Sequence, residues 1–87
     1  MDEIEINFTP PERDLILNHT FADPELTDKI KIAKMKGKHI ITRYSIYHLE
    51  DLIGFIAAEA NHTEDKQLGM KLDRLFEKLS RILERFV

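Results

Sequence analysis

One pair of residues in this sequence has the spacing of a metal-binding motif. Glu59 and His62 are three positions apart, which places a carboxylate and an imidazole on one face of a helix, as in carboxylate-bridged iron and manganese sites. Those sites need two such pairs and two further buried glutamates, whereas this chain has one pair, at the end of an apolar segment. We therefore expect no metal ion and interpret His62 as a capping or loop residue.

Side chains that could act as a nucleophile or a base are present, but no motif supports them. Ser45, Ser80, Asp51 and Asp73 are candidates by residue type alone. A nucleophilic serine needs a glycine-rich turn and an oxyanion loop, and the chain has only three glycines and no cysteine. We expect no catalytic residues, no cofactor and no small-molecule substrate, so the chain is not expected to be an enzyme.

Positive charge is concentrated in the middle of the chain. Between Lys29 and Arg43 there are six Lys or Arg residues and no Asp or Glu, although the formal net charge of the chain is -3. Such a segment could bind nucleic acid or another anion, with Tyr44 or Tyr47 stacking on a base. The phosphate contacts would come from Lys29, Lys34, Lys36, Lys38 and Arg43.

The other interpretation of these lysines is a solvated rim. In helical projection they bracket an apolar stripe instead of lining up, as expected for side chains that extend outward from the border of a buried face. No recognition helix follows the basic segment, and the net charge is negative. Nucleic-acid binding is therefore the alternative hypothesis and not the leading one.

The most regular pattern in the sequence is apolar. Between residues 64 and 86, apolar residues alternate spacings of four and three, which is typical of a helix with a coiled-coil-like seam. Phe76 and Leu83 widen this stripe beyond what one neighbouring helix covers. We expect a homodimer, or a groove for a helix of another protein, at a surface formed by Phe55, Phe76, Leu83 and Phe86. A closed monomeric core is the other interpretation.

The elements that position these residues follow from periodicity and turn signals. Alternation predicts strands at about 3–8 and 38–45, which pair either within one chain or between subunits. Helices are predicted at about 10–18, 24–37, 46–60 and 64–86. The expected fold class is mainly α (α+β): a small bundle of four helices, with the last two forming an antiparallel helical hairpin, and a short two-stranded sheet.

Capping residues define the expected helix ends. Thr9 with Glu12 forms a capping box, and Asp23, Ser45 and Thr63 can cap the later helices. Asparagine in a left-handed conformation is expected to end the first and third helices, at Asn18 and Asn61, and Gly37 the second.

Size and composition favour one small domain over residues 1–87. A core this small gives marginal stability, for which dimerisation is a common remedy. The first residues do not resemble a secretory signal and no apolar segment is long enough to span a membrane, so we expect a cytoplasmic protein with no membrane partner. Our leading hypothesis is a small non-catalytic protein–protein interaction or regulatory module, homodimeric through the last two helices.

Overall fold

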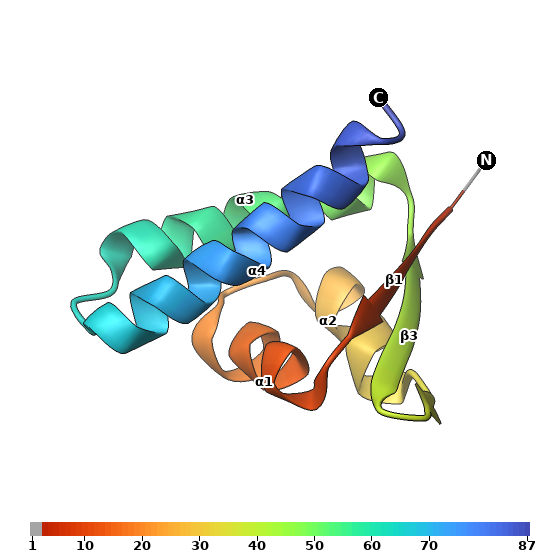
Figure 1. Cartoon of the computed structure of the whole chain (residues 1–87), viewed down its shortest axis with the longest axis horizontal. Coiled ribbons are helices and arrows are strands. Elements are labelled where there is room, and N and C mark those ends of the chain that lie inside the picture. Colours follow the sequence, from red (N-terminus) through yellow and green to blue (C-terminus); the bar gives the residue numbers. More distant parts are fainter. Residues whose placement is uncertain (1–2) are drawn as a thin grey trace.

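The computed structural model describes residues 3–87, which form four helices and a small antiparallel sheet (Figure 1). In chain order the elements are β1 (Ile4–Phe8), α1 (Pro10–His19), α2 (Pro24–Ile32), β2 (Met35–Lys36), β3 (His39–Tyr44), α3 (Ile46–His62) and α4 (Lys66–Glu84). The mixed α+β class, the four helices and the close packing of α3 against α4 agree with the sequence prediction. None of the helices described within 3–87 combines the length and the apolar character that crossing a bilayer requires.

The sheet has three strands in the order β1-β3-β2, so the prediction of two strands was wrong. β1 pairs with β3 inside one chain, with Ile4 opposite Tyr44 and Phe8 opposite Ile40. The missed strand is β2, which pairs with the start of β3 through a turn at Gly37. Gly37 has a φ of 64°, a left-handed conformation that suits glycine. Its turn connects β2 to β3, so the prediction that Gly37 ends the second helix was wrong. The second helix accordingly stops at Ile32.

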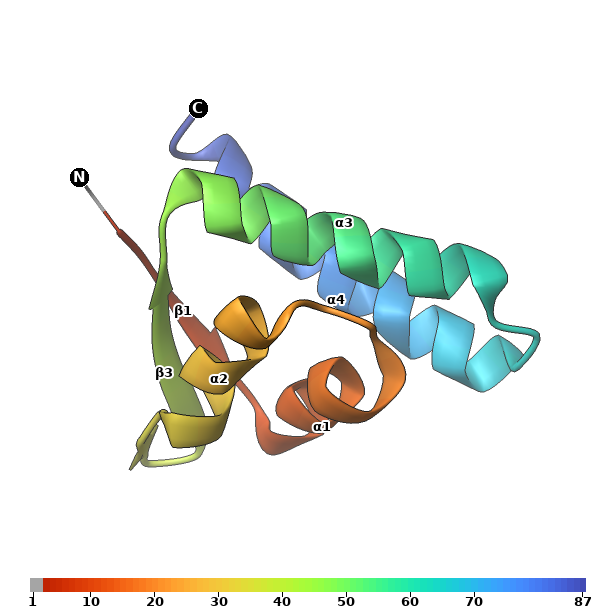
Figure 2. The same cartoon turned by 180° about the vertical axis from the view of Figure 1, so that it is seen from behind.

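One face of the sheet is buried and the other is open. Alternate residues of β1 and β3 point into the core, and all four helices lie on that side of the sheet (Figures 1 and 2). Thr42 is the polar residue of the inward row, and its hydroxyl donates to the Ile6 carbonyl at 3.3 Å. The outward row, which includes Glu5 and Arg43, is exposed to solvent.

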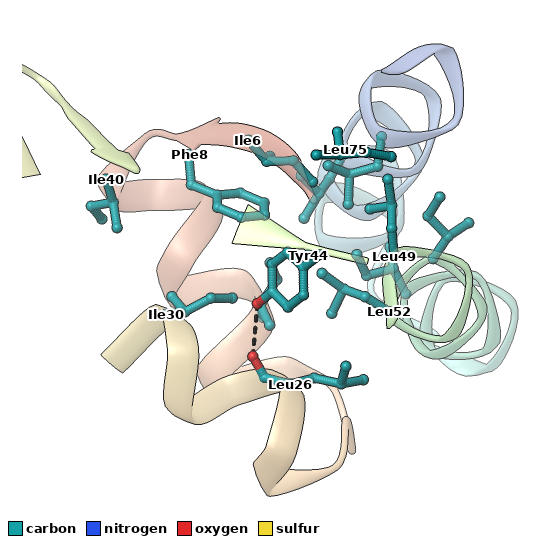
Figure 3. Packing of buried hydrophobic residues seen from close by; sticks show 14 of the residues in the cluster. Ile6, Phe8, Leu26, Ile30, Ile40, Tyr44, Leu49, Leu52 and Leu75 are labelled. Carbon is teal, nitrogen blue, oxygen red and sulfur yellow. Dashed lines mark hydrogen bonds between the residues drawn. The ribbon is translucent and has the colours of Figure 1, made fainter. Parts of the chain in front are cut away.

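Tyr44 lies at the centre of the core (Figure 3). Its ring is fully buried, and its hydroxyl donates to the Leu26 carbonyl at 2.7 Å, which ties β3 to the first turn of α2. Burial raises the pKa of the Tyr44 phenol well above its ordinary value. Leu49 and Leu52 of α3 and Leu75 of α4 complete the cluster around the sheet residues.

The apolar seam of α4 is satisfied within the monomer. Leu72, Leu75 and Leu79 are at most 1% exposed, because α3 and the inner face of the sheet cover them. Periodicity therefore predicted the helix correctly, whereas its most regular positions are unavailable to a second chain. Only the residues that widen the stripe remain candidates for an outside contact.

The predicted N-cap residues of the helices were partly correct. Thr9 and Glu12 form the expected capping box, and Ser45 accepts from the His48 amide at 3.1 Å. Asp23 stands at its N-cap position without a side-chain hydrogen bond, and α4 is capped by Asp65 and not by Thr63.

The predicted left-handed asparagines were also wrong. No residue other than glycine within 3–87 has a positive φ, and α1 and α3 end instead at the extended residues Thr20 and Thr63. In both places a threonine in extended conformation leads the chain away from the helix, so no left-handed residue is needed.

Candidate functional site

The basic segment predicted to bind anions is divided by the fold, beginning with Lys29. This lysine lies on α2, and its ammonium donates to the Arg43 carbonyl at 3.1 Å. It lies 3.6 Å from a carboxylate oxygen of Glu3 and 5.4 Å from the centre of the Tyr44 ring. These contacts hold Lys29 against β3, so it is a structural residue and not a free cation.

The other end of the segment is also occupied. Arg43 lies on the open face of the sheet, opposite Glu5 on β1, with 3.6 Å between guanidinium and carboxylate. Tyr44 is buried and cannot stack on a base, whereas Tyr47, at the start of α3, is 71% exposed. The predicted anion site therefore loses Lys29 and Tyr44, and a carboxylate lies beside Arg43.

What remains is a basic hairpin, which we define as Lys34, Lys36 and Lys38. All three are exposed, and within residues 3–87 none of them forms an ion pair. The turn at Gly37 brings Lys36 and Lys38 onto the same tight loop. Met35, between Lys34 and Lys36, is 54% exposed, and Ile32 at the end of α2 is 80% exposed. This hairpin therefore presents positive charge beside exposed apolar side chains.

The four apolar residues predicted to form one surface lie in two places. Phe55 lines a pocket together with Asp23 and Asp51, on the side of α3 that faces the segment leading into α2. Phe76 and Leu83 are half-buried, one heptad apart on α4, and Phe86 follows the helix with 54% of its surface exposed. We call Phe76, Leu83 and Phe86 the apolar flank of α4. Phe55 does not belong to it.

A second basic region was missed in the sequence. On α4, five cations follow alternating spacings of three and four, which places them along one side of the helix. We call them the basic flank of α4: Lys71, Arg74, Lys78, Arg81 and Arg85. The signal is the same heptad spacing as in the apolar seam, but apolar and acidic residues separate these cations in the sequence.

The basic flank borders a cleft between α1 and α4, which lie beside each other in Figure 1. The cleft has a volume of about 580 Å³. Pro11, Leu15 and Leu75 line it with apolar surface, and Lys71, Arg74 and Lys78 supply cations from α4. The α1 side contributes two carboxylates and an imidazole, from Glu12, Asp14 and His19.

Lys78 is the best anchored of these cations. Its ammonium lies 2.7 Å from both the Asn7 carbonyl and a Glu12 carboxylate oxygen, and 5.8 Å from the centre of the Phe8 ring. The same Glu12 oxygen accepts from the Thr9 amide at 2.8 Å. Lys78 thus joins α4, the end of β1 and the capping box of α1.

The residues considered for catalysis or metal binding include a helix cap and two residues of a helix end. The Ser45 hydroxyl caps α3, and Glu59 and His62 lie in the last turn of the same helix. Across residues 3–87, no group of three His, Asp or Glu side chains comes together in a way that would hold a metal ion.

Comparison with known proteins adds no further constraint. No protein-family model matches the chain, and neither the curated proteins nor the solved structures searched include a match. The surfaces described above are therefore the features of this chain that bear on its function.

Proposed function

We propose that this chain is a small non-catalytic protein–protein interaction or regulatory module that forms a homodimer through the outer side of the α3–α4 hairpin. The observation that carries the proposal is the apolar flank of α4, where the half-buried Phe76 and Leu83 lead to the exposed Phe86. Aromatic residues of this kind are typical anchors at the centre of protein interfaces. A second copy of the flank would cover them.

The charges beside this flank make the strength of the proposed dimer depend on salt. In projection, Asp73, Glu77 and Glu84 follow one another along the neighbouring side of α4. Two copies joined through their apolar flanks bring these carboxylates close to their symmetry mates. Added salt screens that repulsion, so the dimer should become tighter as the ionic strength rises.

The test is the mass in solution over a range of protein concentrations, with a variant that leaves the core intact. Ser80 lies one turn after Phe76, between the apolar flank and the acidic side of α4 in projection. Ser80→Glu therefore adds charge beside the flank without removing a core side chain. We expect a dimeric wild-type mass and a monomeric Ser80→Glu protein whose circular dichroism spectrum matches that of the wild type. Its melting temperature should fall only by the stabilisation that dimerisation supplies. The matched control is Phe21→Ser, which removes a residue that is 87% exposed in the segment between α1 and α2. A monomeric wild type, or a dimer insensitive to Ser80→Glu, would contradict the proposal.

The basic hairpin supports a second candidate, charge-driven nucleic-acid binding. Three exposed lysines without ion pairs inside residues 3–87 favour it, and Met35 adds apolar surface beside them. Titration into labelled mixed-sequence DNA and RNA at low and near-physiological salt should show binding that weakens as salt rises. The slope of log K against log salt should be about -2 to -3 for this number of phosphate contacts. Replacing Lys34, Lys36 and Lys38 with glutamate should abolish the binding and leave the dimer intact. Absence of binding at low salt would exclude this candidate.

A further inference from the structure

The basic flank of α4 is longer than the cleft beside it. From Lys71 to Arg85 the helix rises by roughly 20 Å at 1.5 Å per residue, and a cation stands on the same side at every turn. Lys71, Arg74, Arg81 and Arg85 are exposed, and none of these four forms an ion pair with any residue from 3 to 87. Lys78 is the exception, because Glu12 neutralises it. A row of unneutralised cations this long is suited to an extended anionic partner.

The cleft adds an apolar component to this charge. Leu15 and Leu75 line it together with Pro11, and its volume of about 580 Å³ lies within the range of ligand-binding clefts. The contact of Lys78 with Glu12 and the Asn7 carbonyl fixes the spacing between α1, α4 and β1 on this side. The cleft is thus held open by a defined contact, with Lys71 and Arg74 on its α4 rim.

We infer that the α1–α4 cleft binds an acidic, amphipathic peptide segment of a partner protein. Apolar side chains of the segment enter the cleft above Pro11 and Leu15, and its carboxylates meet Lys71 and Arg74. Further carboxylates along the segment reach Arg81 and Arg85. Arginine favours this pairing because its planar guanidinium binds a carboxylate through two parallel hydrogen bonds.

The walls of the cleft favour a peptide over nucleic acid. Glu12 and Asp14 on the α1 side carry carboxylates that repel a phosphate backbone, whereas an amphipathic peptide can place uncharged or basic side chains there. No Phe, Tyr or Trp among the described residues lines the cleft, so the His19 ring and the Arg74 guanidinium are the planar groups there on which a base could stack. The charge also continues beyond the cleft toward Arg85, which a compact small molecule could not use.

This site is independent of the proposed dimer surface. In projection, the basic flank and the two helical residues of the apolar flank, Phe76 and Leu83, lie on opposite sides of the buried seam of Leu72, Leu75 and Leu79. A dimer through the apolar flank leaves the cleft open, and a peptide in the cleft leaves the dimer surface open. The two proposals can therefore fail separately.

The test is a binding titration with three probes by fluorescence anisotropy. The first is a labelled peptide of alternating leucine and glutamate pairs, the second is its glutamine counterpart, and the third is mixed-sequence single-stranded DNA of matched length. The site variant is Lys71→Glu with Arg74→Glu. The matched control is Lys34→Glu with Lys36→Glu, which changes the net charge by the same amount on the basic hairpin. Amide shifts in the NMR spectrum of the wild type locate the bound probe, even if the site variant folds poorly.

We expect the glutamate peptide to bind more tightly than the glutamine peptide and to shift amides of α1 and α4 around Leu15 and Arg74. The site variant should weaken that binding by about tenfold or more, since each reversal replaces an attraction with a repulsion. The control pair should change it by less than about twofold. The inference is overturned if the glutamate peptide does not bind, if it binds equally to both variants, if the shifts map elsewhere, or if DNA occupies the cleft more tightly. The mass recorded in the same buffers reports separately on the dimer.

Discussion

The two basic regions of this chain differ in how sequence order relates to spatial order. The segment from Lys29 to Arg43 is continuous in sequence, but the fold divides it among a helix, a hairpin and the open face of a sheet. The basic flank of α4 is interrupted in sequence by apolar and acidic residues, but one helix aligns it. Charge that is contiguous in sequence is thus a poorer guide to a charged surface than charge at helical spacing.

Each basic region contains one lysine whose side chain contacts the sheet, Lys29 in the first and Lys78 in the second. Lys29 donates to the outward carbonyl of Arg43 on β3, and Lys78 donates to that of Asn7 on β1. Each also lies over the ring of a buried aromatic, Tyr44 or Phe8. The two lysines therefore cover exposed carbonyls on opposite edges of the β1-β3 pair, which are positions where another strand could otherwise add.

The largest expected effect comes from removing the better anchored lysine. Lys78→Met should lower the free energy of unfolding by about 1 to 2 kcal/mol, because the Glu12 carboxylate and the Asn7 carbonyl both lose a short charge-assisted contact. Lys71→Met, on the same flank but without such contacts in the described chain, should change it by less than about 0.5 kcal/mol. Urea unfolding of both variants measures the difference, and equal effects would show that Lys78 has no structural role.

The next largest loss of stability is expected from a substitution in the turn of the basic hairpin. Gly37→Ala is expected to cost about 1 kcal/mol, because an alanine at a φ of 64° is strained. A Cβ at this position meets nothing within 4 Å, so the cost is conformational and not steric contact with the surroundings. Thermal unfolding measures it, and Gly54→Ala, at a helical glycine with equally open surroundings, is the control that should be neutral or stabilising. A neutral Gly37→Ala would mean that the turn does not require a left-handed residue.

The contribution of Tyr44, whose ring lies under the Lys29 ammonium, to the free energy of unfolding should depend on pH. Tyr44→Phe should cost about 1 kcal/mol at neutral pH through the lost hydrogen bond to the Leu26 carbonyl. Because burial raises the pKa of Tyr44 in the folded chain, the wild type keeps its full stability below about pH 10, the ordinary pKa of tyrosine. Above that pH only the unfolded chain ionises readily, so stability falls.

Urea unfolding at about pH 8 and about pH 11 tests this sign. The loss between the two pH values should be larger for the wild type than for Tyr44→Phe, which retains every lysine that titrates in the same range. Parallel losses in the two proteins would contradict the buried, neutral phenol.

The smallest expected effect is a difference in stability between two variants of the basic segment. One is at Lys29, which contacts β3, and the other is at Lys34, which forms no ion pair within residues 3–87. Lys29→Met should cost about 0.5 kcal/mol, because its contacts are partly exposed and screened. Lys34→Met, on the basic hairpin, should leave stability unchanged within error. If both are neutral, the contact of Lys29 with β3 does not contribute to folding.

Several elements of this fold could be predicted because their signals are local. The capping box of Thr9 and Glu12, the Ser45 cap and the alternation of β1 each depend on residues a few positions apart. The strand β2 was missed because two residues carry almost no periodicity, and the lysines around it suit a helix equally well. The surface predicted from Phe55, Phe76, Leu83 and Phe86 combined two helices without knowing their relative rotation, and Phe55 lines a pocket with Asp23 and with other residues of α3.

The sequence by itself determined the helices α3 and α4 and the apolar seam of α4, because each is a periodic pattern along one helix. The basic flank has the same helical spacing, although it was not predicted. Only the tertiary structure decided which apolar and basic residues remain available. The seam leucines are covered by the sheet and α3, and Lys78 reaches a carbonyl 71 positions away in the chain. Such contacts depend on how distant elements pack, and no local pattern encodes that arrangement.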